Sequence, residues 1–312
     1  MRQQLAPRKD YTQVAWDERL IDDARQLIRL AVREDLDRFQ DWTTTLLVDS
    51  SATGSATFVA KEPGVVCGTR MLELIADEMQ TSIVVDNRFN DGDVVTANDQ
   101  ISRVSGPARE ILTCERIMLN FAGRLSGVAT TTQKYVQAIG GTQCQIYDTR
   151  KTTPGWRRLE KYAVSCGGGQ NHRTGLFDGI LIKDNHRMLS QQAADQSLAD
   201  LVVQAREGAA SALDSSITST KLMIEIEVDT LDELRQVIVK HPDIVLLDNM
   251  SCSQMQQAVA IRDQLSPETE LEASGGITID DLKNVAATGV ERISIGALTH
   301  SVRSLDIGLD WQ

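Results

Sequence analysis

The chain has 312 residues, with 32 basic and 44 acidic side chains, and 41% of its residues are hydrophobic. That length and apolar content suit two domains, or one large domain, and argue against a disordered, collagen-like or disulfide-stapled protein. The net charge of −12 argues against general nucleic-acid binding, which needs a basic face. We therefore expect a globular protein whose partners are not nucleic acids.

Neither the start of the chain nor any internal run has the pattern of a signal peptide or a membrane span. The opening MRQQLAPRKD has no apolar core. The longest aliphatic runs, 179–182 and 244–247, are far too short to cross a bilayer. The five cysteines are scattered and form no CxxC pair, so neither a zinc site nor a disulfide framework is indicated. We expect reduced thiols in a cytoplasmic protein without membrane contact.

The first third of the chain mixes helical and strand patterns. Asp17 precedes apolar residues at helical spacing and is a predicted N-cap. Pro63-Gly64 and Asn90–Asp93 are turn signals between alternating runs. Gly123 and Gly127 within a long helical pattern would permit a close packing contact. The predicted elements are a helix over 17–36, strands over 53–66, a helix over 69–79, strands over 83–104 and a helix over 113–139.

From about residue 143, short apolar strands alternate with helical patterns. Such repetition predicts parallel strands with right-handed crossovers, and six units are too few for a closed eight-stranded barrel. We therefore predict an open, incomplete α/β barrel. Capping signals predict helix starts at Thr230, Ser251 and Thr278, and the small polar residues 209–220 predict a surface loop. The predicted strands are 145–148, 179–183, 222–228, 243–248, 270–273 and 292–295.

Every one of these strands ends in a charged residue or a glycine. In α/β barrels the chemistry lies where strands end and loops begin, so this pattern predicts one shared site at that face. The strand-end residues are Thr149-Arg150-Lys151, Lys183-Asp184-Asn185, Glu225 and Glu227, Asp248-Asn249, Ser274-Gly275-Gly276, and Gly296-Ala297.

Two glutamates occupy the same strand and need separate interpretations. Period-two alternation places Glu225 and Glu227 on the barrel interior. Buried carboxylates need partners, so Glu225 is either structural, paired with Lys or Arg, or functional. Glu227 lies nearer the end of the strand and is the stronger candidate for ligand contact. Asp248 has the same register on the next strand, and the two acids could flank a small sugar-like ligand.

Two glycine-containing strand ends indicate phosphate binding. Ser274-Gly275-Gly276 precedes a helix expected to start near Thr278, and glycines with a helix N-terminus can approach an anion closely. The last two strand–loop units of α/β barrels often hold phosphate, and Gly296 lies in the second of these units. A plain turn is the alternative interpretation.

Basic residues gather at the same strand ends and loops, although the chain is acidic. Several cations facing one cavity repel one another unless a strongly anionic ligand binds, and arginine forks suit carboxylate and phosphate. We therefore predict a small polyanion that carries both groups. The three glycines of 167–169 fit neither GxGxxG nor a P-loop, and a simple linker is their alternative interpretation. The basic residues are Arg150, Lys151, His172, Arg173 and Lys183.

Taken in order, the motifs of the chain resemble the quinolinate phosphoribosyltransferase family, also called nicotinate-nucleotide pyrophosphorylase (carboxylating). The resemblance covers nearly the whole chain. In the first half it rests on Asp41-Trp42-Thr43-Thr44, Glu115–Asn120, Thr149–Thr152, Lys161–Val164 and Gly167–Arg173. In the second half it rests on Leu181–His186, Ile224–Val228, Leu246–Asn249, Glu272–Gly276 and Ser294–His300.

The resemblance implies a fold and a reaction. It implies an N-terminal α/β sandwich domain over 1–125, rejoined by 298–312, and an open α/β barrel over 126–297. It implies transfer from 5-phosphoribosyl 1-diphosphate to quinolinate with decarboxylation, requiring Mg²⁺, which gives nicotinate mononucleotide, diphosphate and CO₂ in NAD biosynthesis. A homodimer or a dimer-based hexamer is also implied.

The resemblance further implies roles for individual residues. Arg150, His172, Arg173 and Lys183 match positions that hold the two carboxylates of quinolinate, and Arg116 matches an arginine that reaches the neighbouring subunit's site. Lys151, Lys183, Glu227 and Asp248 are the catalytic candidates, and Glu227 and Asp248 match the acids that contact ribose and Mg²⁺. The phosphoribosyl diphosphate candidates are Thr149, Lys151, Glu227, Asp248, Ser274, Gly275, Gly276, Ile295, Gly296, Ala297 and His300.

Three other functions remain open. A nicotinate phosphoribosyltransferase-like enzyme would bind one carboxylate without decarboxylation, and Arg116, Arg150 and Arg173 supply more cations than that needs. A Schiff-base aldolase would use Lys183, but it favours a pocket that lowers a lysine pKa rather than several anionic substrates. A non-catalytic anion-binding protein would not need Glu227 and Asp248 together.

Overall fold

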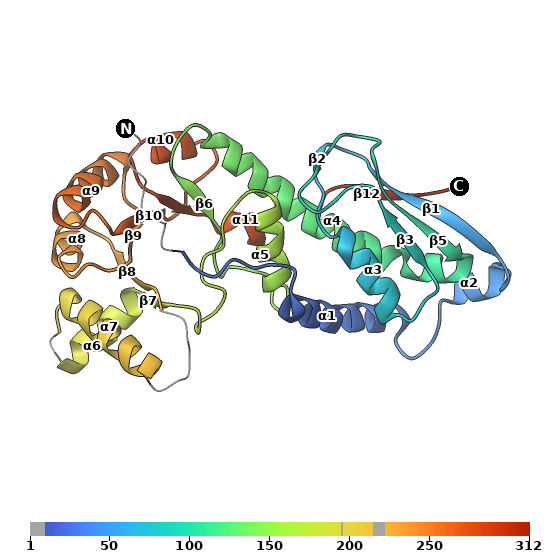
Figure 1. Cartoon of the computed structure of the whole chain (residues 1–312), viewed down its shortest axis with the longest axis horizontal. Helices are drawn as coiled ribbons and strands as arrows, with labels where there is room; N and C mark the ends of the chain where they lie inside the picture. Colours follow the sequence, from blue (N-terminus) through green and yellow to red (C-terminus); the bar gives the residue numbers. More distant parts are fainter. Residues whose placement is uncertain (1–9, 195, 215–221) are drawn as a thin grey trace. The chain divides into compact units, whose positions relative to one another are not determined.

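The computed structural model describes residues 10–194, 196–214 and 222–312, and they form two compact units (Figure 1). One unit comprises the described residues within 10–13, 135–150 and 170–295, and we call it the barrel unit. The other comprises 14–134, 151–169 and 296–312, and we call it the sandwich unit. Within the described ranges, no helix combines the length and the apolarity that a membrane crossing requires. The domain boundaries expected from the family resemblance stay a prediction.

The sandwich unit is built on an antiparallel sheet. Its strand order is β12-β1-β5-β3, so the last strand of the chain pairs with the first, and a separate two-stranded sheet joins β2 to β4. The turn signals separate these strands as predicted. The bounds are β1 Thr53–Ala60, β2 Gly64–Val65, β3 Val84–Asn87, β4 Val94–Val95, β5 Gln100–Pro107 and β12 Ile307–Trp311.

Helices pack beside this sheet, and the longer ones among them bury an apolar face. The predicted cap is confirmed, since the Asp17 carboxylate accepts a hydrogen bond from the Leu20 amide at 2.9 Å. Leu20, Ala24 and Ile28 then form the buried face of α1. The helices are α1 Glu18–Leu36, α2 Trp42–Leu47, α3 Thr69–Glu78, α4 Ala108–Ala138, α5 Arg157–Cys166 and α11 Ala297–His300.

The two glycines of α4 allow close backbone contact, as their placement in the helix predicts. The Gly123 carbonyl accepts a hydrogen bond from the Leu305 amide at 2.9 Å. A Cβ at Gly127 would lie 2.3 Å from the Arg303 carbonyl oxygen and 2.9 Å from the Ser304 Cα. Both opposing atoms belong to the backbone, so a larger residue would force the C-terminal segment away from the helix.

We therefore expect Gly127→Ala to lower the free energy of unfolding by about 2 kcal/mol, the typical cost of overpacking a rigid contact. Gly208→Ala in α7 is the matched control, since a Cβ there meets no atom within 4 Å. Alanine favours helix, so the control should be as stable as the wild type or slightly more stable. The measurement is the thermal unfolding midpoint of each variant. Equal midpoints for the two variants would contradict the contact.

The barrel unit contains a six-stranded parallel sheet of order β6-β11-β10-β9-β8-β7. Among the described strands, β6 and β7 lie at opposite ends of this order and do not pair, so the barrel is open, as predicted. The strands are β6 Gln145–Tyr147, β7 Ile180–Ile182, β8 Ile224–Val228, β9 Ile244–Asp248, β10 Glu270–Ser274 and β11 Arg292–Ser294.

Helices between the strands cover the outside of this sheet, as Figure 1 shows for α8 and α9 beside β8 to β10. The caps at Thr230 and Ser251 are confirmed: each hydroxyl accepts a hydrogen bond from the third residue of its helix. The helices are α6 Asp184–Ala194, α7 Leu198–Asp214, α8 Leu231–Ile238, α9 Cys252–Leu265 and α10 Leu282–Ala286.

Two local predictions are wrong. The helix expected at Thr278 begins only at Leu282, because the Asp281 carboxylate accepts hydrogen bonds from the amide and hydroxyl of Thr278 and closes a turn instead. The loop expected over 209–220 is helical up to Asp214, where α7 ends. Alanine is the best helix former, and it outweighs the polar residues there. Residues 215–220 lie outside the described residues.

Candidate functional site

Parallel pairing brings the carboxyl ends of the six strands to one edge of the barrel unit. The register places Ser274 opposite Asp248, and Glu227 opposite Leu246. Lys183 directly follows β7, and Thr149 and Arg150 follow β6 within two or three residues. In open α/β sheets this edge is where ligands bind. The sheet therefore gathers the predicted barrel-unit residues on one edge.

Glu227 and Lys183 form an ion pair at this edge. The Lys183 ammonium donates to the Glu227 carboxylate at 2.8 Å, and the glutamate side chain is buried while the lysine is about half exposed. Arg187 holds the backbone below the pair by donating to the Glu227 carbonyl at 3.1 Å, and it also pairs with Asp229 and Glu233. The carboxylate is thus held in place at the strand end, with a cation beside it.

Asp248 lies in an acidic environment at the end of β9. Burial raises its pKa, and the charges of Glu227 and Asp229 raise it further. The Asn249 amide group donates to the Asp248 carboxylate at 2.7 Å, and Asn249 itself has φ 53°. Because two carboxylates repel each other here, a cation or a hydrogen-bonding ligand would stabilise both.

The glycine segment after β10 packs against Asn249. A Cβ at Gly275, which has φ +97°, would lie 2.2 Å from the Asn249 side-chain oxygen, whereas a Cβ at Gly276 would meet nothing within 4 Å. The Ser274 carbonyl accepts a hydrogen bond from the Asn249 amide at 3.0 Å. The segment is therefore a tight turn joined to the end of β9. Since α10 starts at Leu282, any phosphate contact rests on turn amides rather than on a helix terminus.

Arg173 places a buried guanidinium group in this region. Only 5% of it is exposed, and its Nε has no hydrogen-bond partner. One guanidinium nitrogen, Nη1, donates to the Gly179 carbonyl at 3.1 Å. Burial lowers its pKa, and the like charge of Arg150 lowers it further. A buried guanidinium with an unused donor beside another cation is the arrangement that an anionic ligand would stabilise.

His172, by contrast, is directed at other side chains. Its Nδ1 accepts a hydrogen bond from the Arg173 amide at 2.8 Å. Its Nε2 lies 3.0 Å from a Glu225 oxygen and 3.5 Å from a Glu272 oxygen. We infer from the Nδ1 contact that the neutral ring carries its proton on Nε2. The contact predicted between His172 and quinolinate stays a prediction, and both ring nitrogens already have protein partners.

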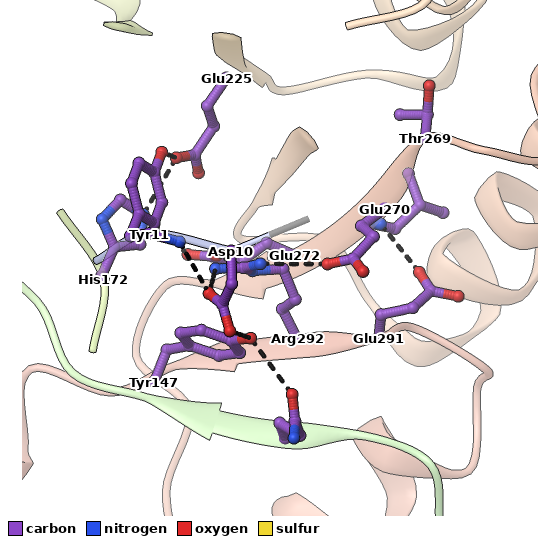
Figure 2. Close-up of polar contacts among 12 residues, drawn as sticks. Asp10, Tyr11, Tyr147, His172, Glu225, Thr269, Glu270, Glu272, Glu291 and Arg292 are labelled. Carbon is purple, nitrogen blue, oxygen red and sulfur yellow. Dashed lines mark hydrogen bonds and ion pairs between the residues drawn. The ribbon is translucent and has the colours of Figure 1, made fainter. Parts of the chain in front are cut away.

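Glu225 lies in the barrel interior, as its register predicts. Its partners are Tyr11 and His172 rather than the Lys or Arg considered above. Figure 2 shows these groups beside a second set centred on Arg292, which pairs with Asp10, Glu270 and Glu272. The interior is thus lined by paired charges.

His172, Glu225 and Glu272 also bring three ligand atoms within 4.8 Å of one another, a spacing that could hold a metal ion. A metal at Nε2 would need the lone pair of that nitrogen, and a metal-bound imidazole normally donates through its other nitrogen. Here Nδ1 accepts, so Nε2 carries the proton. The tautomer therefore argues for a hydrogen-bonded cluster rather than a metal centre.

The sandwich unit holds the remaining candidates except Ile295, which belongs to the barrel unit. A Cβ at Gly296 would lie 3.0 Å from the Lys151 side chain and 3.1 Å from the His300 ring, so these three residues lie together. The Thr299 hydroxyl donates to the Lys151 carbonyl at 2.7 Å and fixes that backbone. Arg116 is exposed on α4. Ile295 and Ala297 flank Gly296 in the chain, and Ile295 is buried.

Sequence reasoning missed several residues that organise the site. The Asp148 carboxylate accepts hydrogen bonds from the Asn171 side chain and the His172 amide, both at 2.8 Å, and so joins β6 to the segment that carries Arg173. Tyr11, Glu272 and Arg292 line the interior. Charged residues on apolar strands were a usable signal for Glu272 and Arg292, whereas no local pattern marks Tyr11.

Comparison with known proteins agrees with this geometry. Residues 41–126 match the family model for the N-terminal domain of quinolinate phosphoribosyl transferase, and residues 128–310 match the model for its C-terminal domain. A nicotinate-nucleotide pyrophosphorylase (carboxylating) of Mycobacterium leprae is 42% identical over 291 residues, which cover 93% of this chain and 97% of the relative.

A second curated relative and a solved structure extend the comparison. A probable nicotinate-nucleotide pyrophosphorylase (carboxylating) of Bacillus subtilis is 40% identical over 82% of each chain. The nicotinate-nucleotide pyrophosphorylase structure from Francisella tularensis superposes with a TM-score of 0.85 at 36% identity, covering 97% of this chain and all of the other. Sequence, fold and domain models thus agree, and the chain belongs to the quinolinate phosphoribosyltransferase family.

Proposed function

We propose that this chain transfers the phosphoribosyl group of 5-phosphoribosyl 1-diphosphate to quinolinate and decarboxylates the product, giving nicotinate mononucleotide, diphosphate and CO₂ for NAD biosynthesis. Membership of the family and the names of its relatives support this pentosyltransferase reaction. The observation that carries it is Arg173, a buried guanidinium with a free Nε and Arg150 for a neighbour. A dicarboxylate would supply the anionic charge that stabilises a buried guanidinium beside a second cation.

The proposed reaction balances without a covalent enzyme intermediate. The lone pair of the pyridine nitrogen forms the bond to the ribose anomeric carbon while the bond to diphosphate breaks, and its electron pair leaves with diphosphate. The ring nitrogen becomes cationic. The bond from C2 to its carboxylate then breaks, CO₂ leaves, and the electron pair stays on C2 beside the cationic nitrogen. C2 finally takes up one proton.

The chain's own residues would bind and orient both substrates. Arg150 and Arg173 would hold carboxylates, aided by Lys183 and by Arg116 of the partner subunit, and His172 would act through its contact with Arg173. Glu227 and Asp248 would hold the ribose hydroxyls and stabilise positive charge at the anomeric carbon. The remaining contacts to phosphoribosyl diphosphate would come from Thr149, Lys151, Ser274, Gly275, Gly276, Ile295, Gly296, Ala297 and His300.

Magnesium is part of the proposal. The ion binds oxygen ligands and usually takes one or two carboxylates together with substrate phosphates. Glu227 and Asp248 fit that donor set, because both are carboxylates at adjacent strand ends and burial and neighbouring acids raise the pKa of Asp248. These two residues would hold Mg²⁺, which supplies charge compensation for the departing diphosphate.

A homodimer, or a hexamer built from dimers, is proposed on two features of the sandwich unit. Arg116 is exposed on α4, where it is accessible to a second subunit. The surface around α2 exposes large apolar side chains that a second copy would cover. These are Phe39, Trp42, Leu46 and Leu47, which are 71%, 56%, 73% and 80% exposed. Sedimentation of the purified protein measures the assembly. The cytoplasmic location predicted above stays a prediction.

The alternatives have weaker support. Nicotinate offers one carboxylate, whereas the neighbouring cations Arg150 and Arg173 suit a ligand with two. A Schiff-base mechanism needs the Lys183 nitrogen to be available to a carbonyl substrate, but that nitrogen already donates to the Glu227 carboxylate at 2.8 Å. A purely non-catalytic role would not need the two acids Glu227 and Asp248 together.

The test is a turnover assay with quinolinate, phosphoribosyl diphosphate and Mg²⁺ that follows the mononucleotide and CO₂ together. A parallel reaction contains nicotinate in place of quinolinate. We expect equal amounts of both products with quinolinate and no mononucleotide with nicotinate. If the enzyme turned over nicotinate and not quinolinate, the reaction would be the one-carboxylate transfer. The assignment of Arg150 and Arg173 to a dicarboxylate would then be wrong.

A further inference from the structure

The N-terminal segment 10–13 lies inside the barrel unit, against the segment that carries Arg173. The Gln13 side chain makes two hydrogen bonds to the Asn171 backbone, accepting from the amide at 2.7 Å and donating to the carbonyl at 3.2 Å. Tyr11 is 3% exposed, and Figure 2 shows its ring beside His172, with its hydroxyl directed at Glu225. The segment is thus built into the unit rather than loosely attached.

Tyr11 makes three close contacts there. Its hydroxyl donates to a Glu225 carboxylate oxygen at 2.6 Å. Its ring centroid lies 4.6 Å from the centroid of the His172 ring. The Tyr11 ring also packs on Gly179 so tightly that a Cβ at Gly179 would lie 2.7 Å from it. Only a glycine at position 179 therefore leaves room for the Tyr11 ring.

Two of these neighbours are the groups that hold Arg173. His172 Nδ1 accepts the hydrogen bond of the Arg173 amide at 2.8 Å, and the Gly179 carbonyl accepts from the Arg173 guanidinium at 3.1 Å. Tyr11 thus lies behind both anchors of the arginine, one on its backbone and one on its side chain. Its hydroxyl donates to Glu225 rather than to a group of Arg173.

Tyr11 and His172 are also linked through Glu225. The Tyr11 hydroxyl and the His172 Nε2 both point at the same carboxylate oxygen, at 2.6 Å and 3.0 Å. Because the Glu225 carboxylate accepts from Nε2, the ring proton stays on Nε2. The lone pair of Nδ1 then accepts the hydrogen bond of the Arg173 amide. The tyrosine hydroxyl keeps this oxygen in place, so the link from Tyr11 to the Arg173 backbone is continuous.

We propose that Tyr11 is a positioning residue that aligns Arg173 for a substrate carboxylate, so that the N-terminal segment sets the affinity for the dicarboxylate. This inference rests on the proposed function. It assigns Tyr11 no contact with substrate. Its effect is therefore specific to the carboxylate-bearing substrate, whereas a general loss of stability would weaken the binding of both substrates.

The test compares Tyr11→Phe with the wild type and with Tyr147→Phe. The first variant removes one hydroxyl and keeps the ring. The control removes another buried hydroxyl, which bonds to Asp10 in the same N-terminal segment and to the Gln145 side chain, both at 3.2 Å. We expect Tyr11→Phe to raise KM for quinolinate about 5-fold with KM for phosphoribosyl diphosphate unchanged, and the control to change neither.

Calorimetric titration with quinolinate supplies a second readout that does not depend on turnover. Tyr11→Leu, which also removes the ring, should weaken quinolinate binding more than Tyr11→Phe. If the wild type binds quinolinate but does not turn it over, the proposed function fails while the binding ratios still test Tyr11. Equal quinolinate affinity in Tyr11→Phe and wild type would overturn the inference. So would equal rises in both KM values, or a matching rise in Tyr147→Phe, or failure of the wild type to bind quinolinate.

Discussion

Replacement of Arg173 by lysine is expected to lower kcat/KM for quinolinate by about 100-fold, because lysine keeps the charge and loses the planar fork that binds a carboxylate through two hydrogen bonds. The loss should appear mainly in KM for quinolinate. KM for phosphoribosyl diphosphate should stay within about 2-fold of the wild-type value, since Arg173 is assigned only to the dicarboxylate. Steady-state kinetics with each substrate varied in turn measure both constants.

The matched control is Arg206→Lys. Arg206 is exposed and donates to the backbone carbonyls of Lys240 and His241, so its replacement tests an arginine-to-lysine change away from the strand ends. We expect wild-type kinetics from this variant. If Arg173→Lys also retained its quinolinate KM, the assignment of the buried guanidinium to a carboxylate would be wrong.

Stability should move in the opposite direction from activity at this position. Burial and the charge of Arg150 both disfavour the charged form of Arg173 and lower its pKa, so the cation destabilises the ligand-free fold. Arg173→Met removes that cost, at the loss of one hydrogen bond to Gly179. We therefore expect its unfolding midpoint without ligand to equal or exceed that of the wild type. A clearly lower midpoint would indicate a structural role for the arginine.

The strand pattern of the barrel could be predicted because it depends on local and repeated signals. Short apolar runs separated by capped helices leave few topologies other than a parallel open barrel. Once the sheet is parallel, the strand ends must share one edge, so Lys183, Glu227 and Asp248 could be grouped without a structure. Caps such as Asp17 and Ser251 were predictable for the same reason, because a cap bonds within its own turn.

The interior network could not be predicted in this way. The Tyr11 hydroxyl bonds to Glu225 across 214 positions of sequence, and Asp10 pairs with Arg292 across 282. No periodicity marks a contact between a terminal segment and a distant strand. The protein partners of His172 could not be predicted for the same reason: they are two buried glutamates that sequence spacing does not bring near it. The ligand contact that its motif suggests stays a prediction.

The helix expected after Gly276 failed for a different reason. Thr278 and Asp281 form a capping pattern, but the same side chains can also close a turn on themselves, and the local sequence does not distinguish the two outcomes. In the structure the Asp281 carboxylate takes both hydrogen bonds of Thr278, which lowers its pKa, and the helix begins one residue after it.

The second large effect is expected from the acids at the ends of β8 and β9. Glu227→Gln keeps the shape of the side chain and removes its charge, and we expect kcat to fall by about 100-fold or more because a charge held near the reacting carbon is lost. The pKa of Asp248 should fall in this variant, since the charge of Glu227 adds to burial in raising it. The acidic limb of the pH–rate profile, where Asp248 takes up its proton, should therefore move to lower pH. Measurement of kcat/KM from about pH 4 to about pH 9 tests this shift.

Asp248→Asn should separate function from stability. A carboxyl whose pKa is raised on folding binds its proton more tightly in the folded than in the unfolded protein, so its ionised form destabilises the fold above that pKa. Asp248→Asn avoids this cost, so the variant should lose activity yet be at least as stable as the wild type at neutral pH. The difference in the free energy of unfolding should shrink in acid, where Asp248 of the wild type becomes protonated. Asp35→Asn, at an exposed position on α1, should change neither property. Urea unfolding at neutral and acidic pH measures the effect. If Asp248→Asn is less stable than the wild type at neutral pH, the carboxylate supports the fold, and its assignment to ribose and Mg²⁺ loses its main physical argument.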